Sequence, residues 1–248
     1  MLGTGTSTGV PVIGCACAVC TSDDPRNRRL RPGVRIDLPA GTAIVDTPTD
    51  LRQQALTYGI ERVDAVLFTH GHADHILGLD ELRVFNFRQR ASIPCYGPPS
   101  ALAAIRRTFA YAFEEGQEGG GKPRVELLPI APEAFELLGA EVLPVPVQHG
   151  ELEVYGYRFG PFAYVTDVSF IPEESFARLY GVEVLVLGAL RFRPHTTHFS
   201  IPEAVEAAAR IGARRTFFTH LAHDVDHTAP GDLPPGVELA YDGLVLEL

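Results

Sequence analysis

Four side chains that can bind metal ions stand within six residues, in the segment His-Gly-His-Ala-Asp-His at positions 70–75. Histidine and aspartate are poor core residues unless they are paired, so burial alone is a weak explanation for this density. His70 and His72 can reach one ion from an extended turn, and Asp74 and His75 can reach a second ion beside it. The segment therefore predicts a site for two metal ions.

A second cluster of possible ligands lies near the start of the chain. Cys15, Cys17 and Cys20 fall within six residues, whereas Cys95 stands alone in an apolar run. In a cytoplasmic protein, clustered cysteines indicate a metal site more often than disulfides. A free-thiol or redox cluster is the alternative interpretation. We expect Cys95 to be a small buried hydrophobic residue.

Other candidate ligands follow short β-branched runs that read as strands. The strand and polar residue pairs are Thr42–Asp46 with Asp46, Val63–Thr69 with His70, Val142–Val147 with His149, Ala163–Thr166 with Asp167, and Thr216–Thr219 with His220. Sites are usually built on loops that a rigid scaffold positions. These strand ends are therefore expected to meet.

The remaining elements predict an α/β protein with sheets packed between helices. Further strands are expected at Val125–Leu128, Leu152–Phe159, Val182–Leu187 and Leu244–Leu248. Helices are expected at Thr49–Tyr58, Ser100–Tyr111 and Ser200–Ile211, with Ser100 and Ser200 as N-caps and Glu203 completing a capping box.

Length and composition limit the possible organisation. The 248 residues suit one large domain or two small ones. The Gly-rich stretch 114–123 is expected to be a surface loop, and candidate ligands on both sides of it favour a single domain, 1–248. No apolar run approaches the roughly 20 residues that span a bilayer, and the first residues lack a secretory pattern. We expect a soluble, cytoplasmic protein that does not contact the membrane.

The charge disfavours a nucleic-acid partner. The chain has 21 Lys and Arg residues against 31 Asp and Glu, a formal net charge of −10. Nucleic-acid binders use Lys and Arg to displace counterions from phosphates. The arginines at positions 26, 28, 29 and 31 could form a local basic patch, but a solvated loop explains them at least as well.

The segment at 70–75 resembles the signature of the metallo-β-lactamase superfamily. His149, Asp167 and His220 match the remaining ligand positions of that superfamily in the same order. The resemblance implies an αββα sandwich with a binuclear metal site at one edge of two sheets. It also implies one ion on His70, His72 and His149, a second on Asp74, His75 and His220, Asp167 as a bridge, and Asp46 as a hydrogen-bonding support.

The N-terminal residues resemble one particular branch of this superfamily. The segment Leu-Gly-Thr-Gly-Thr-Ser at 2–7 is similar to the branch that holds transfer-RNA 3′-processing nucleases and cyclic phosphodiesterases. The cysteine trio, with His223 three residues after His220, resembles the phosphoribosyl cyclic phosphate phosphodiesterase family of the phosphonate pathway. That resemblance implies a structural zinc on these four residues. The superfamily usually has a strand ahead of residues 2–7, so we expect a shorter sheet edge or a start upstream.

Three histidines lie outside both sets. His198, just before a predicted helix, matches a histidine that assists the leaving group in phosphodiesterase relatives. His195 is expected to support the site or lie on the surface, and His227 could support the ligands or lie on the surface.

These features predict a metal-dependent phosphodiesterase acting on small, cyclic phosphodiesters. Two Mn or Zn ions about 3.5–4 Å apart can share a hydroxide that attacks phosphorus. Asp74 and His198 are the expected catalytic side chains, with His198 acting on the departing oxygen. A homodimer is compatible with the resemblance. The alternatives are an RNA 3′-processing nuclease of the same superfamily and a non-enzymatic metal-binding scaffold.

Overall fold

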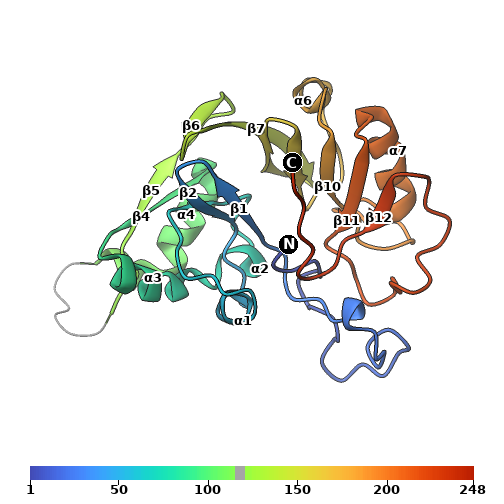
Figure 1. The fold of residues 1–248 in the computed structure, drawn as a ribbon, viewed down its shortest axis with the longest axis horizontal. Helices are drawn as coiled ribbons and strands as arrows, with labels where there is room; N and C mark the ends of the chain where they lie inside the picture. Colours follow the sequence, from blue (N-terminus) through green and yellow to red (C-terminus); the bar gives the residue numbers. More distant parts are fainter. Residues whose placement is uncertain (115–120) are drawn as a thin grey trace.

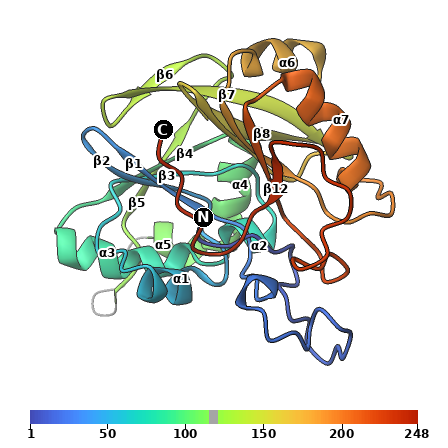
Figure 2. The same ribbon diagram turned by 45° about the vertical axis from the view of Figure 1, so that its right-hand side comes forward.

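The computed structural model describes residues 1–114 and 121–248. Part of the predicted Gly-rich loop, residues 115–120, lies outside the described residues. Two sheets pack face to face, and helices cover the outer face of each (Figures 1 and 2). This is the predicted αββα sandwich, so the α/β fold class is confirmed.

The first sheet has the strand order β1-β2-β3-β4-β5. Its strands are β1 (Val34–Leu38), β2 (Gly41–Val45), β3 (Ala65–Leu67), β4 (Ile93–Gly97) and β5 (Val125–Pro129). The helices of this half are α1 (Leu51–Thr57), α2 (Ala73–Ile76), α3 (Leu82–Gln89), α4 (Pro99–Thr108) and α5 (Ala110–Phe113). Strands β2 to β5 run parallel and β1 is antiparallel to β2.

The second sheet runs from β12 to β6 in reverse chain order. Its strands are β6 (Phe135–Leu137), β7 (Ala140–His149), β8 (Leu152–Phe159), β9 (Phe162–Val165), β10 (Val184–Gly188), β11 (Arg215–Thr219) and β12 (Val237–Leu239). Helices α6 (Glu173–Leu179) and α7 (Ile201–Ile211) cover its outer face (Figure 1). Strands β9 to β12 run parallel, and β7 has the same direction because β8 is antiparallel to both β7 and β9.

The apolar core has three layers that match this architecture. Between the sheets, buried residues such as Val45 and Leu67 pack with Tyr164 and Phe217. A second cluster joins the first sheet to its helices, and a third joins the other sheet to α6 and α7. Strands buried on both faces read as continuous apolar runs, which is why β3 and β10 were visible in the sequence.

The N-terminal Gly-Thr-Gly motif depends on close backbone contacts. A Cβ atom at Gly3 would lie 1.9 Å from the carbonyl oxygen of Arg31, and one at Gly5 would lie 2.8 Å from that of Arg29. The N–H of Leu2 donates to the carbonyl of Gly33 at 2.8 Å. The motif therefore packs directly against the backbone of residues 29–31, where a side chain at position 3 or 5 would not fit.

Helix α7 begins as predicted. The Ser200 side chain accepts from the N–H of Glu203, and the Glu203 side chain accepts from the N–H of Ser200, which completes the capping box. The prediction of Ser100 as an N-cap was wrong. Helix α4 has Pro98 at the N-cap and Pro99 in its first turn, because proline is preorganised for that position.

The strand predicted at Leu244–Leu248 was also wrong. The N–H of Leu244 donates to the carbonyl of Tyr241, and the segment pairs with no strand among the residues that the structure describes. Leu244 packs into the core between the sheets while Val245 and Leu248 are exposed, so the alternation of apolar residues has a packing cause without a ladder. No helix in the described parts of the chain is long and apolar enough to cross a membrane.

Candidate metal centre

The carboxyl ends of five strands, two from the first sheet and three from the second, deliver polar residues to one edge of the sandwich. Asp46 follows β2 directly, and His70 comes three residues after β3. In the second sheet, His149 ends β7, Asp167 lies two residues after β9, and His220 follows β11. Asp74 and His75 lie in the short helix α2, where a turn was predicted.

The structure brings these residues into two adjoining groups. Within each group, one ligand atom per residue lies within 4.8 Å of every other. The first group is His70, His72, His149 and Asp167, and the second is Asp74, His75, Asp167 and His220. All of these residues are buried except His72, which is exposed.

Asp167 belongs to both groups and turns a different oxygen to each. Its Oδ2 lies 3.7 Å from Nε2 of His70 and 3.9 Å from Nε2 of His149. Its Oδ1 lies 3.3 Å from Nε2 of His75 and 3.1 Å from Nε2 of His220. A carboxylate placed in this way can bind two cations at once.

Hydrogen bonds fix which ring nitrogen of three histidines is free. Asp46 Oδ2 accepts from Nδ1 of His75 at 2.7 Å and from the Thr69 hydroxyl at 2.9 Å. The Thr69 hydroxyl proton is thus used, so its oxygen accepts from Nδ1 of His70 at 3.0 Å. The carbonyl of Thr197 accepts from Nδ1 of His149 at 2.6 Å. In the neutral form of each ring the proton is therefore on Nδ1, and Nε2 faces the site with a lone pair that can bind a metal ion.

The electrostatics of the site suit cations. Burial alone would raise the pKa of Asp74, but the His220 and His75 rings, whose Nε2 atoms lie 3.5 and 3.4 Å from its carboxylate, hold that pKa far below its usual range. Burial would lower the pKa of His75, yet Asp167 and Asp46 raise it well above normal. The same carboxylates that attract a proton to His75 would attract a metal ion.

Two buried nitrogens also indicate a missing partner. Within residues 1–114 and 121–248, Nε2 of His75 and Nε2 of His220 have no hydrogen bond, although both are buried and face Asp74 and Asp167. A buried polar atom left unpaired costs about 1–3 kcal/mol. The donor set of imidazoles and carboxylates fits divalent first-row ions.

Strain marks the same residues. Asp46, Asp167 and His220 adopt positive φ angles of 65°, 50° and 60°. Non-glycine residues in this region cost on the order of 1–3 kcal/mol each, and such residues cluster at functional sites. Gly71 serves a different need, because a Cβ atom there would lie 2.5 Å from Cβ of Ala104 in α4.

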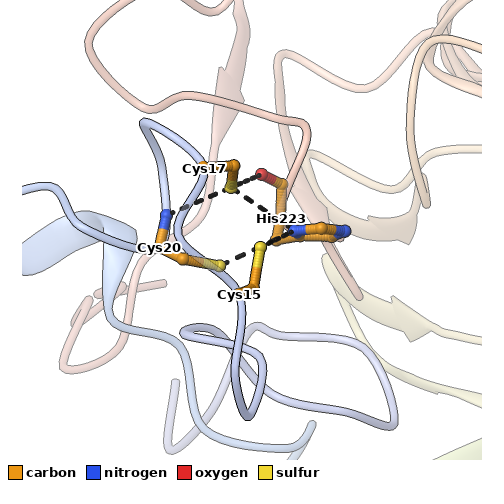
Figure 3. A group of neighbouring side chains, drawn as sticks. All are labelled: Cys15, Cys17, Cys20 and His223. Atoms are coloured by element: carbon orange, nitrogen blue, oxygen red, sulfur yellow. Dashed lines mark hydrogen bonds between the residues drawn. The ribbon is translucent and has the colours of Figure 1, made fainter.

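Three cysteines and His223 form a separate cluster (Figure 3). The sulfur atoms of Cys15, Cys17 and Cys20 lie 3.3, 3.5 and 3.6 Å from Nδ1 of His223. The sulfur-to-nitrogen edge of a tetrahedral zinc site with ordinary bond lengths is about 3.6 Å. The four side chains therefore already have the spacing of a closed zinc site.

Hydrogen bonds prepare this cluster for a cation. The N–H of Cys20 donates to the Cys17 sulfur and, with His223 and Cys15, lowers the pKa of Cys17 to about 6. The N–H of Val12 donates to the sulfur of Cys20. Burial raises the pKa of Cys20 to about 11 and that of Cys95 still further. Cys95 is fully buried and lies apart from the cluster, as expected for a core residue.

One buried arginine side chain holds the loop that supplies one candidate ligand to the second group and one to the cysteine cluster. Arg29 is 1% exposed, and its guanidinium donates to the carbonyls of Ala222 at 3.0 Å and Val225 at 2.7 Å. These carbonyls belong to the loop that carries His220 and His223. Arg29 was expected in a basic patch or a solvated loop, and both interpretations were wrong for this residue. Its neighbours in sequence gave no signal of burial.

The three other histidines lie at different depths. The ring of His198 is 4.5 Å from that of His149 and 4.8 Å from that of His220, between centroids. Burial and His220 lower the pKa of His198 to about 3. His195 is exposed, with its ring 5.2 Å from that of His198. His227 packs against Tyr241 and belongs to neither group.

Comparisons with known proteins agree with this geometry. A family model described as "Beta-lactamase superfamily domain" matches residues 42–221. A crystal structure described as a new diphosphatase from the PhnP family is 46% identical, with a TM-score of 0.93, covering 100% of this chain and 96% of that one.

Two sequence relatives have other names. An octanoyltransferase of Porphyromonas gingivalis is 36% identical over 98% of this chain, but the chain spans only 50% of that relative's length. A ribonuclease Z of Myxococcus xanthus is 28% identical over 90% of this chain and 94% of that protein.

Proposed function

Because the chain belongs to the metallo-β-lactamase superfamily and, within it, to the PhnP family, we propose that it is a metal-dependent hydrolase of small phosphodiesters. The observation that carries the proposal is the placement of Asp167, whose two oxygens face two separate sets of ligand atoms. An intact pair of sets argues against a degenerate scaffold.

The residues divide between two ions as follows. His70, His72 and His149 would hold one ion, Asp74, His75 and His220 would hold the other, and Asp167 would contact both. Two divalent ions supply Lewis-acid stabilisation of phosphoryl oxygens and an activated water at neutral pH. Zinc and manganese both suit imidazole and carboxylate ligands.

The protein's own residues would orient the metal ligands and stabilise the departing oxygen. His198 lies against rings from both ligand sets, and because its lowered pKa keeps the ring neutral near pH 7, its N–H would stabilise the leaving oxygen by donating a hydrogen bond to it. Asp46, Thr69 and the Thr197 carbonyl keep the ligand rings in one tautomer. Asp74 acts through the second ion as a ligand.

The cysteine cluster is proposed to hold one structural zinc on Cys15, Cys17, Cys20 and His223. Replacing Cys17 by Ser should remove this zinc and lower thermal stability, while the binuclear ions are at first retained. Zinc content unchanged in that variant would refute the assignment. Cys95→Ser is the matched control, since Cys95 lies outside the cluster.

The choice of substrate has three candidates. A small cyclic phosphodiester was expected from the sequence. The 46%-identical relative is described as a diphosphatase, which supports a phosphoanhydride substrate. The ribonuclease Z relative supports RNA, but the net charge of −10 disfavours a polyanionic partner.

An activity panel tests the proposal directly. The metal-loaded protein should cleave bis(p-nitrophenyl) phosphate, a 2′,3′-cyclic nucleotide or a diphosphate diester, and leave precursor transfer RNA, a thioester and a β-lactam intact. Cleavage of RNA or thioester alone would overturn it.

Two variants check the site itself. His75→Ala should abolish turnover while the far-ultraviolet circular dichroism stays native. His227→Ala changes a residue outside both ligand sets, so this variant should keep its turnover and its native circular dichroism. Metal analysis should find two ions in the binuclear site and one in the cysteine site. A protein that holds no more than one ion in total would contradict the two-site arrangement.

A further inference from the structure

A row of imidazole rings leads from the ligand sets to the surface. The rings of His149 and His220 lie 4.5 and 4.8 Å from that of His198, which in turn lies 5.2 Å from that of His195. Exposure rises along the row, from buried His149 and His220 through half-buried His198 to exposed His195. The proposed function uses the row only as far as His198, so His195 has no assigned role.

The local chain fixes which nitrogen of His195 is a donor. Nδ1 of His195 accepts from the N–H of Thr197 at 3.3 Å and lies 3.2 Å from its hydroxyl. In the neutral ring the proton must then be on Nε2. His195 therefore offers an N–H donor on the solvent side of His198.

The loop that carries His195 is cationic in an acidic protein. Arg191 donates from Nε to the carbonyl of Arg193 and from Nη2 to that of Pro194, both at 3.3 Å, which shapes the turn before His195. Burial and the charge of Arg191 both lower the pKa of His195. The side chain of Arg193 is 78% exposed and approaches Asp224 only to 3.6 Å. The rest of the chain supplies the excess of negative charge.

We propose that His195 and Arg191 bind the leaving group, and that this subsite selects substrates whose leaving group is itself a phosphate. The inference rests on the proposed function and deepens it. A phosphate leaving group carries negative charge and oxygen acceptors beyond the departing atom, and these would meet the His195 N–H and the Arg191 cation. The alkoxide released from a cyclic or nucleoside phosphodiester has no such group.

The reaction is the hydrolysis of a diphosphate diester. A bond forms from the water oxygen to one phosphorus, and the bond from that phosphorus to the bridging oxygen breaks. The electron pair stays on the bridging oxygen, which leaves as part of a phosphate monoester. The two protons of the water pass to solvent near pH 8, because phosphate monoesters lose their second proton near pH 6.

The test compares two dinucleosides with different leaving groups. Diadenosine diphosphate joins two 5′-oxygens through a diphosphate and has a phosphate leaving group, whereas adenylyl-(3′→5′)-adenosine joins a 3′- to a 5′-oxygen through one phosphate and has an alkoxide. His195→Ala should lower kcat/KM for the diphosphate about tenfold, chiefly through KM, with a smaller loss for the diester. His195→Gln, which keeps an N–H donor, should recover part of the loss, and Arg191→Gln should resemble His195→Ala.

A binding measurement tests the subsite without turnover. The product AMP should bind the metal-loaded protein about tenfold more weakly in His195→Ala than in the wild type, by titration calorimetry, at equal metal content. Thr196→Ala, an exposed neighbour in the same loop, and Arg214→Ala, an exposed arginine before β11, should match the wild type.

The outcomes separate this inference from the proposed function. Equal AMP affinity in the wild type and His195→Ala, or equal losses on both dinucleosides, would overturn the subsite while leaving the hydrolase intact. A wild type inactive on every phosphodiester and diphosphate of the panel would overturn the function instead.

Discussion

At the scale of single residues, the site depends on buried groups that would not touch a substrate. Asp46 is fully buried, and its carboxylate takes hydrogen bonds from the His75 ring and from both donors of Thr69. The hydroxyl oxygen of Thr69 in turn accepts from Nδ1 of His70, which fixes the orientation of that ring. One carboxylate thus orients a ring in each ligand set. The sequence indicated Asp46 through the family resemblance, but nothing in it indicated Thr69.

Replacing Asp46 by Ala should weaken metal binding without unfolding the protein. Removing such an outer-shell partner typically costs 10–100-fold in metal affinity. Chelator competition followed by elemental analysis would measure the change. Asp50→Ala is the control, because Asp50 pairs with Arg31 outside both ligand sets and should leave affinity unchanged. Equal affinities for the wild type and Asp46→Ala would contradict the orienting role.

Asp242 should make stability depend on pH. Burial raises its pKa from 3.8 to about 6, although Thr4 and the N–H of Leu30 donate to it. Because the pKa of Asp242 is higher in the folded than in the unfolded protein, the folded state binds the proton more tightly. The stability gained from this proton is fully present below pH 3.8 and is lost as pH rises through about 6. The free energy of unfolding of the wild type, relative to Asp242→Asn, should fall by about 1.4 kcal/mol from pH 5 to pH 8. A constant difference over that range, in denaturant titrations, would refute the assignment.

At the scale of elements, the strands that form apolar runs were predictable from the sequence. The runs that became β3, β7, β9 and β11 each led into a polar residue, and those residues converge. Two elements were not predicted, for different reasons. Strand β1 alternates Val34, Ile36 and Leu38 with charged Arg35 and Asp37, which is the period of a half-buried strand, so its signal was present in the sequence. Helix α2 has only four residues, too few to show a helical period.

Contacts between distant segments explain the other failures. Arg29 is buried because two carbonyls about 195 residues away in the chain accept its protons, and adjacent residues cannot encode this. The positive φ angles of Asp46, Asp167 and His220 are likewise imposed by the assembled strand ends. Long-range packing of this kind is invisible to propensity and periodicity.

The Gly-Thr-Gly motif gives a prediction at this scale. Gly3→Ala should destabilise the protein by several kcal/mol, because its Cβ would meet a backbone carbonyl at 1.9 Å that cannot move away freely. Gly33→Ala is the matched control in the paired segment, since its Cβ would meet nothing closer than 3.6 Å. Thermal unfolding of both variants tests the difference. Similar melting temperatures for the two would show that the close contact is unimportant.

At the scale of the whole molecule, the ligand sets join the two sheets. His70 and His75 come from the first sheet and its helix α2, whereas His149, Asp167 and His220 come from the second sheet. Each of the two sets draws on both sheets. We infer from this that residues 1–248 form one domain, which remains a prediction for unfolding experiments. An ion in either set would cross-link the halves of the sandwich.

Metal removal should therefore weaken the entire fold. An ion that binds only the folded state stabilises it by about 2.7 kcal/mol when its free concentration is 100 times the dissociation constant. Calorimetry should show a single unfolding transition in the metal-loaded protein, and chelation should lower its midpoint by several degrees.

Two variants show which metal site causes the lower unfolding midpoint after chelation. Cys17→Ser should still respond to chelation, because the binuclear site remains, whereas His75→Ala should respond less, because one of its sets is incomplete. Two separate transitions, with only one sensitive to chelation, would mean that the halves unfold independently. The ligands would then lie across a boundary between domains, and the cross-linking role of the ions would be excluded.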